Sequence, residues 1–281
     1  MTPRTLLVVL ACLGATQDQA PTFRSGIEAV RVDVLVTRDG RPLTGLAPAD
    51  FDVLDNGVPQ RIDYAAFEDI PLNLVFAIDA SGSVEEDRAQ RLRRACHGVL
   101  TELRQNDQAG LVVFSDPVVV RSGLTRDLAF VRTALDRPLP IGETALVDAT
   151  HASILLAESE PGRALVIVFS DGIEVSSYLP ADAVLETAKR SDAVVYGVAL
   201  RGVPSPRFLR KLAETSGGDY YEIASPLDIE PAFRKVLEEF RHRYLLSFTP
   251  TGVERTGWHR LQVRVRQRGA SVKARPGYFR Q

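Results

Sequence analysis

Four continuous apolar runs constrain the fold of the middle of this chain. They cover residues 72–78, 109–114, 164–169 and 193–200, and each is as long as an ordinary strand. Uninterrupted apolar runs are typical of strands that are covered on both faces. Between the first two runs, apolar residues recur at helical spacing: Leu92, Ala95, Cys96, Val99 and Leu103.

Strand-like and helix-like segments alternate from residue 71 to residue 241. Further helices are expected near 126–136, 145–158, 180–190, 205–215 and 226–241, an antiparallel edge strand at 118–124, and the last strand at 220–223. This order predicts a doubly wound α/β domain over 71–241, with a mostly parallel sheet and helices on both faces. On the first helix, Cys96 falls on the apolar face, which predicts a packed and unreactive thiol.

Both ends of the chain show strand patterns instead. Residues 28–66 alternate, with Val30, Val32, Val34 and Val36 on one face, and residues 55–57 form a turn signal. Beyond residue 241, strands are expected at 244–248, 261–265 and 270–274, with Trp258 as a packing residue. Neither segment has enough strands for a core of its own. We therefore predict that segments 21–70 and 242–281 pack together as one small antiparallel β-sandwich.

The first 20 residues have the pattern of a signal peptide. Arg4 precedes a short apolar run at 6–13, and small residues follow. A buried first strand is the alternative. The run Val9-Leu10-Ala11-Cys12 also resembles a lipoprotein cleavage box, so a lipid anchor at Cys12 stays open. No run is long enough to span a bilayer. We expect an exported protein that is periplasmic, at the cell surface or secreted.

Charge is distributed unevenly along the sequence. The net charge of −2 argues against nucleic acid as the partner of the whole molecule. From His242 to Gln281, however, there are nine Arg or Lys residues and one acid, Glu254. Two interpretations stay open for this basic tail. It is either an electrostatic patch for a polyanion, or the solvated face of strands whose arginines discourage edge-to-edge pairing.

The first apolar run ends in a group of oxygen donors. Asp79, Ser81 and Ser83 occupy alternate positions in the loop that follows it, and Gly82 allows a tight turn between the serines. One carboxylate and two hydroxyls are oxygen ligands of the kind that Mg²⁺ and Mn²⁺ accept. Helix capping is the alternative role for these side chains.

Two further oxygen donors are expected at the same edge of the sheet. Thr144 lies at a boundary between a loop and a helix, and Asp171 follows the run at 164–169. Ligands of open α/β sheets bind beyond the carboxyl ends of the strands. Five donors from three loops would leave one coordination position for water or for a carboxylate of a partner. The alternatives are a helix cap for Thr144 and a turn residue for Asp171.

With these motifs the chain resembles the von Willebrand factor type A domain. The metal-ion-dependent adhesion site of that family is an Asp-x-Ser-x-Ser run with a later Thr and a later Asp, which here match Asp79, Ser81 and Ser83, then Thr144, then Asp171. The resemblance covers about 170 residues. The segments 50–57 and 275–279 also look like the secreted bacterial, acidobacterial-type members of the family.

The resemblance implies a site for Mg²⁺ or Mn²⁺ that captures an acidic side chain of a protein partner. In the family, the serines and the threonine usually bind the metal directly, and the aspartates bind it directly or through water. Glu143 departs from the family, which often has Gly there. We assign Glu143 and Glu174 to the rim that contacts the partner, while local capping is open for Glu174.

We expect a protein-binding module and not an enzyme. The sequence shows no nucleophile elbow, phosphate-binding loop or Cys-His pair. Two other functions stay open. One is a metal-independent structural scaffold, and the other is a metal-dependent hydrolase, because a metal with an open position can activate water.

Overall fold

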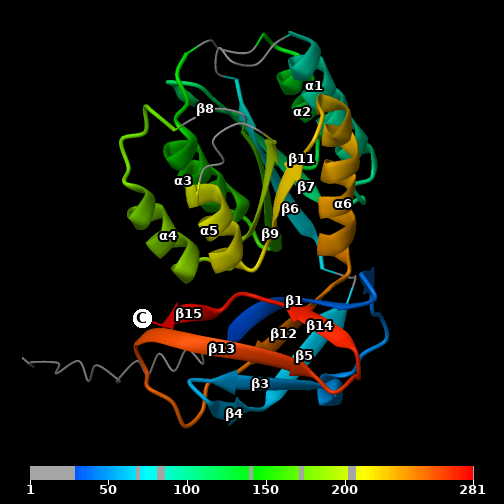
Figure 1. Cartoon of the computed structure of the whole chain (residues 1–281), viewed down its shortest axis with the longest axis vertical. Coiled ribbons are helices and arrows are strands. Elements are labelled where there is room, and N and C mark those ends of the chain that lie inside the picture. Colours follow the sequence, from blue (N-terminus) through cyan, green and yellow to red (C-terminus); the bar gives the residue numbers. More distant parts are fainter. Residues whose placement is uncertain are drawn as a thin grey trace, which may run out of the picture.

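The computed structural model describes residues 29–67, 70–80, 86–138, 142–170, 174–201 and 207–280. An α/β unit and a β-sandwich are stacked end to end along the long axis of the molecule (Figure 1). The expected signal peptide and Cys12 lie outside the described residues. Within the described ranges, no helix is long and apolar enough to cross a membrane.

The α/β unit is built on one six-stranded sheet in the order β11-β10-β9-β6-β7-β8. All neighbouring strands run parallel except β8, which is antiparallel to β7. The strands are β6 (Leu72–Asp79), β7 (Gln108–Phe114), β8 (Val118–Thr125), β9 (Arg163–Phe169), β10 (Val194–Leu200) and β11 (Tyr220–Ile223). The predicted doubly wound sheet with an antiparallel edge is confirmed.

Helices cover both faces of this sheet. The helices are α1 (Glu86–Thr101), α2 (Leu128–Leu135), α3 (Leu146–Ala157), α4 (Ala181–Arg190), α5 (Arg207–Ser216) and α6 (Ile229–Arg241). Phe76 of β6 packs in the core with α1, α2 and α6, whereas its neighbours Val75 and Ala77 pack in the core with α3, α4 and α5. Because successive strand residues point to opposite faces, both faces must be apolar, which explains the uninterrupted runs.

The β-sandwich is assembled from both ends of the chain. One sheet has the order β14-β1-β12-β5 with β2 beside β1, and the other has the order β15-β13-β3-β4. The elements are β1 (Val30–Arg38), β2 (Arg41–Pro42), η1 (Pro48–Asp50), β3 (Phe51–Asp55), β4 (Val58–Gln60), β5 (Ile62–Phe67), β12 (Arg243–Phe248), β13 (Gly257–Val265), β14 (Ala270–Lys273) and β15 (Gly277–Arg280). Strand β15 was not predicted, and Trp258, which the sequence predicts to be a packing residue, is 40 % exposed.

Each sheet of the sandwich contains strands from both ends of the chain, and they alternate in the sheet β14-β1-β12-β5. Strand β1 pairs with β12, and β3 pairs with β13, both antiparallel. The valines of β1, from Val30 to Val36, pack on Phe51, Tyr244 and Phe248 in one core. The prediction that the terminal segments form one small sandwich is therefore confirmed.

Polar side chains connect the sandwich to the base of the α/β unit. Arg163 at the start of β9 forms a buried ion pair with Asp33 of β1. Arg243 of β12 is fully buried and donates to Tyr196 Oη at 2.9 Å and to the Gly217 carbonyl at 2.7 Å. After β11 the chain forms η2 (Pro226–Asp228) and then α6, and the single residue His242 connects α6 to β12. The sandwich therefore lies at the amino ends of the parallel strands, and their carboxyl ends lie at the other end of the molecule (Figure 1).

Candidate metal-binding face

Asp79 lies at the carboxyl end of β6, in the middle of the sheet. Its side chain is fully buried, and Ser170 Oγ donates a hydrogen bond to Asp79 Oδ2 at 2.7 Å. Ser170 directly follows β9, the strand that runs parallel beside β6. This bond brings the first motif into contact with the residue that precedes Asp171.

The Thr144 segment is held at the same edge by backbone hydrogen bonds. Thr144 is 3 % exposed, and the N–H of Ala145 donates to the carbonyl of Ser115 just beyond β7. The Thr144 carbonyl accepts the N–H groups of Val175 and Ser176 at 3.1 and 3.2 Å. Thr144 is therefore tied both to the end of β7 and to the segment that follows Asp171.

A close approach at Gly142 fixes the start of this segment. A Cβ atom at this position would lie 2.7 Å from Asp116 Oδ1, which is closer than real Cβ contacts. The absence of a side chain lets the loop before Thr144 pack against the turn that joins β7 to β8.

The described donors suit a hard cation. Asp79 offers a carboxylate, and Thr144 and Ser170 offer hydroxyls, all oxygen ligands of the type that Mg²⁺ and Mn²⁺ take. Ser81, Ser83 and Asp171 lie outside the described residues. Within the part of the chain that the structure describes, no three His, Cys, Asp or Glu side chains are grouped to hold a metal. A site here would therefore depend on hydroxyl ligands as well as carboxylates.

The two rim acids have different surroundings. The Glu174 carboxylate accepts the N–H of Val147 at 3.0 Å and the N–H of Ser177 at 2.8 Å. It thus caps the first turn of α3 and closes its own turn, the local role that the sequence left open. Glu143 is exposed beside the buried Thr144. A contact of either residue with a partner stays a prediction.

Two residues of this face were missed by the sequence reasoning. Ser170 contacts Asp79 directly. Its place in the sequence, between the end of the strand at 164–169 and the candidate ligand Asp171, could have indicated this role. Ser115 lies between β7 and the Thr144 segment, and its buried Oγ has no hydrogen-bond partner among the described residues. Sequence spacing alone gives no indication of Ser115.

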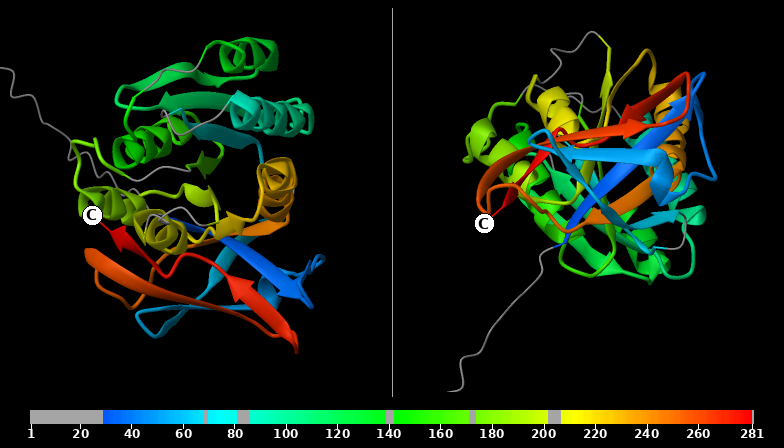
Figure 2. Two further views of the ribbon diagram at one scale, coloured as in Figure 1. Left: turned by 45° about the horizontal axis from the view of Figure 1, so that its top comes forward. Right: turned by 90° about the horizontal axis from the view of Figure 1, so that it is seen from below.

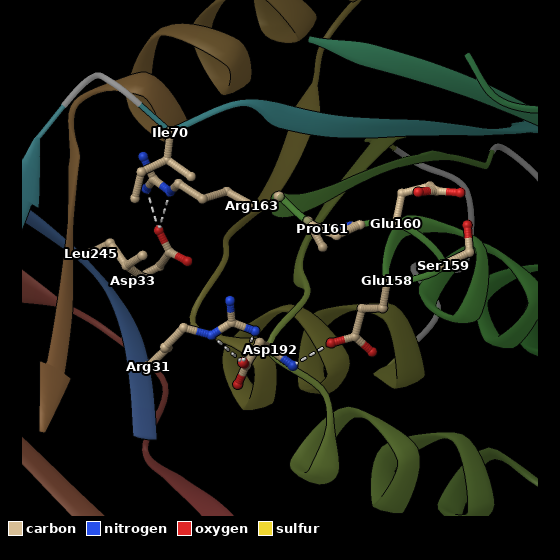
Figure 3. Close-up of a pocket in the computed structure, with 12 residues that line it drawn as sticks. Arg31, Asp33, Ile70, Glu158, Ser159, Glu160, Pro161, Arg163, Asp192 and Leu245 are labelled. Atoms are coloured by element: carbon tan, nitrogen blue, oxygen red, sulfur yellow. Dashed lines mark hydrogen bonds and ion pairs between the residues drawn. The ribbon is translucent and has the colours of Figure 1, made fainter. Parts of the chain in front are cut away.

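A polar cleft of about 490 Å³ lies at the other end of the α/β unit, against the sandwich (Figure 3). Its walls carry the ion pairs Asp33–Arg163 and Arg31–Asp192. Glu158 accepts the backbone N–H of Asp192 at 2.7 Å, and burial raises the pKa of its carboxyl. Because these charged groups already bind one another, the cleft fits a structural junction better than a ligand site.

Comparison with known proteins identifies the fold of the α/β unit. Residues 74–174 match the family model described as the von Willebrand factor type A domain. The unit therefore has the type A fold, a mixed and mostly parallel sheet with helices, to which the terminal segments add antiparallel sheets. No curated protein matches the chain.

Several solved structures resemble the chain. Proximal thread matrix protein 1 from the mussel byssus, with a zinc-occupied MIDAS motif, is 16 % identical, with a TM-score of 0.56 over 65 % of this chain and 48 % of that chain. A von Willebrand factor type A protein from Catenulispora acidiphila is 14 % identical, with a TM-score of 0.55 over 82 % and 73 %. A mutant of the PilB minor pilin from Streptococcus sanguinis is 11 % identical, with a TM-score of 0.50 over 62 % of each chain.

These identities establish a common fold and nothing finer. The chain spans about half the length of the byssus protein. Two of these proteins are a matrix protein and a minor pilin, and the matrix protein has a zinc-occupied MIDAS motif.

Proposed function

We propose that this chain is an exported protein-binding module of the secreted bacterial, acidobacterial type, and that it uses a metal-ion-dependent adhesion site. The site would hold Mg²⁺ or Mn²⁺ and capture an acidic group of a protein partner. The observation that carries the proposal is the hydrogen bond from Ser170 Oγ to the buried Asp79 carboxylate. It joins the ends of the two neighbouring strands β6 and β9, and in the sequence the candidate ligands Asp79 and Asp171 stand at the end of β6 and just after Ser170.

The candidate ligands are Asp79, Ser81, Ser83, Thr144 and Asp171. When bound, the cation would supply an open coordination position for a carboxylate oxygen. Ser170 would orient the carboxylate of Asp79, and the bonds of Ala145, Val175 and Ser176 would hold Thr144 in place. Buried ligands that are fixed before the cation arrives lose little conformational entropy on binding, which favours binding of the cation.

The similar structures support the proposal in a general way. The byssus protein carries a zinc-occupied MIDAS motif and the minor pilin is a surface protein, so both fit binding outside the cell. Glu143 is exposed next to Thr144, where its charge would act on an approaching acidic partner. We infer binding without catalysis. A metal-independent scaffold is the alternative function, and a metal-dependent hydrolase is a weaker one.

The test is a thermal titration of the chelator-treated protein with Mg²⁺ and Mn²⁺. A ligand that binds only the folded state stabilises it by about 2.7 kcal/mol at 100 times its dissociation constant. For a chain of this size, that corresponds to a rise of roughly 5 to 10 °C in the thermal midpoint. The wild-type protein should show this rise.

Asp79→Asn is the informative variant, because the amide oxygen can still accept from Ser170 while the charge is removed. It should remain folded in chelator and lose the response to metal. Asp127→Asn is the matched control, since Asp127 caps α2 and Asn is an equally good cap. It should respond like the wild type. If Mg²⁺ and Mn²⁺ stabilise Asp79→Asn as much as they stabilise the wild-type protein, Asp79 is not a ligand and the proposed site is wrong.

The same samples separate the alternatives. A scaffold would show no change on addition of either metal up to millimolar concentration. A hydrolase would show turnover of a test ester or phosphoester that chelator removes and Mn²⁺ restores.

A further inference from the structure

The segment that leads from β9 to α4 exposes three apolar side chains in its described part, residues 174–180. Val175, Tyr178 and Leu179 are 59 %, 94 % and 36 % exposed. Single apolar residues on a surface are normal, but three within five residues form a cluster. In Figure 1 and in the left view of Figure 2, this yellow-green segment before α4 lies at the edge of the molecule. We call Val175, Tyr178 and Leu179 the apolar turn.

The backbone that carries these side chains is fixed at every residue. Its five consecutive N–H groups, from Val175 to Leu179, all donate hydrogen bonds of 2.8 to 3.2 Å. The Thr144 carbonyl accepts the first two, Glu174 accepts the second and third, and Asp148 of α3 accepts the last two. A turn that is held at each residue presents its side chains to solvent in one backbone arrangement.

The turn and α3 cap each other. Glu174 accepts the N–H of Val147 in the first turn of α3, whereas Asp148 in the same helical turn accepts the N–H groups of Tyr178 and Leu179. Carboxylates are favourable at the N-terminus of a helix. Both acids are thus bound to backbone donors inside the turn, and the apolar side chains form its outer surface.

The apolar turn adjoins the candidate metal face. The N–H of Val175 donates to the carbonyl of Thr144 at 3.1 Å, and Thr144 is one of the candidate ligands. An extended chain advances about 3.3 Å per residue. When a partner places an acidic side chain on the cation, residues a few positions away in that partner therefore come within reach of the apolar turn.

We propose that the apolar turn is a second contact for the protein partner, and that the partner carries a large aromatic or aliphatic side chain close to its acidic group. This inference rests on the proposed function. Tyrosine is enriched among the residues that dominate protein interfaces, and a turn fixed before binding loses little entropy when it is covered. Three side chains alone are too few for a stable contact between two copies of the chain, which would need about 20 to 30 residues a side. The occupant is therefore a short segment of another protein.

A peptide library tests this chemistry directly. The full chain, in millimolar Mg²⁺ or Mn²⁺, is used to select phage-displayed peptides that have a fixed central Asp and random residues on both sides. We expect the selected peptides to share a large apolar residue at a constant distance from the Asp. A second library with a fixed central Asn should yield no metal-dependent binders. Selected Asp peptides without a shared apolar residue would overturn the inference.

Variants of Tyr178 measure its contribution. Truncation of an aromatic residue at the centre of an interface weakens binding about 10- to 30-fold, and Tyr178→Ser should weaken the best selected peptide by this factor. Tyr178→Phe keeps the ring and should bind nearly as well as the wild-type protein. Tyr64→Ser is the matched control, because Tyr64 of β5 is also exposed, at 56 %, but lies in the sandwich. It should leave the affinity unchanged.

The thermal titration with metal separates this inference from the proposed function. Tyr178→Ser removes no candidate ligand, so Mg²⁺ and Mn²⁺ should raise its thermal midpoint as much as that of the wild-type protein. If both proteins respond to metal but bind the peptides equally, or if the metal-responsive wild-type protein selects no peptide, the apolar contact is wrong and the metal site stands. If Asp and Asn peptides bind alike through Tyr178 and metal has no effect, the metal site is wrong, and the inferred contact beside a captured acid fails with it.

Discussion

The buried ion pair between Asp33 and Arg163 gives the strongest prediction about stability. The two residues are 8 % and 6 % exposed and join β1 of the sandwich to β9 of the α/β unit. Arg163 Nε donates to Asp33 Oδ1 at 2.9 Å, and the guanidinium lies 4.7 Å from the centre of the Phe240 ring. Asp33→Ala would leave the guanidinium buried, and the Phe240 carbonyl at 3.4 Å would be its one remaining acceptor within the part of the chain that the structure describes.

The expected cost follows from this geometry. Removing one partner of a buried pair destabilises a protein by about 3 to 5 kcal/mol, because the other charge stays uncompensated. The thermal midpoint should fall by roughly 10 °C for a chain of this size. Arg163→Met added to Asp33→Ala removes the stranded charge and should restore most of the loss.

Urea unfolding followed by circular dichroism measures both effects. Glu222→Ala serves as the control, since Glu222 forms a half-exposed pair with Arg210 at 2.7 Å and should cost less than about 1 kcal/mol. If Asp33→Ala also costs less than about 1 kcal/mol, or if the double variant is as unstable as the single one, the two side chains are not coupled as described. Two separate unfolding transitions in Asp33→Ala alone would show that this pair holds the two units together.

Three further predictions concern single residues. Burial raises the pKa of the Cys96 thiol, so Ellman's reagent should label the native protein far more slowly than the protein in urea. Gly218→Ala should cost at least about 1 to 3 kcal/mol in urea unfolding, because its Cβ would lie 1.9 Å from a backbone oxygen of β10, whereas Gly123→Ala meets no atom within 4 Å and should be near neutral. Burial raises the pKa of Tyr196 to about 12, so stability should fall as the pH rises from 10 to 12, and absorbance at 295 nm should show that Tyr196→Phe removes a tyrosine that ionises near pH 12 in the native protein.

The fold of the α/β unit could be predicted because its strands are covered on both faces. Burial of both faces favours apolar residues at nearly every position, with polar exceptions such as Asn73 near the strand starts, and this leaves a sequence signal that does not depend on long-range contacts. Strand β15 left no such signal. Pro276 and Gly277 indicate a turn, and the strand forms only because its four residues find β13 as a partner.

Polar residues inside the sandwich could not be predicted. Arginines in the tail suggest solvated positions, yet Arg243 is fully buried and Arg275 is 7 % exposed, because the junction supplies hydrogen-bond acceptors. Asp55 binds His259 Nδ1 at 2.8 Å and Tyr278 Oη at 2.7 Å inside the core. Partners more than 200 residues apart in sequence are defined by the tertiary fold alone.

The candidate metal site could be predicted from the sequence only in part. The rule that strand ends meet at one edge predicts that Asp79 and the Thr144 segment approach each other, and both are anchored to the ends of neighbouring strands. The rule does not indicate Ser170 or Ser115, because their roles depend on which way a single residue beyond each strand turns. The positions of Ser81, Ser83 and Asp171 stay predictions.

The pairing of β1 with β12 determines when during synthesis the sandwich can fold. Arg243 and its acceptor, the carbonyl of Asp33, are 210 residues apart, so residues 30–35 of β1 have no native strand partner until nearly the whole chain has been synthesised, and only the end of β1 pairs earlier, with β2. At ordinary translation rates this delay is about 10 to 40 s. During that time β1 is an alternating valine strand with an open edge, which is prone to associate with other chains. Productive biogenesis should therefore depend on a holding chaperone that binds the N-terminal strand, and truncation before β12 should send the chain to aggregation or proteolysis.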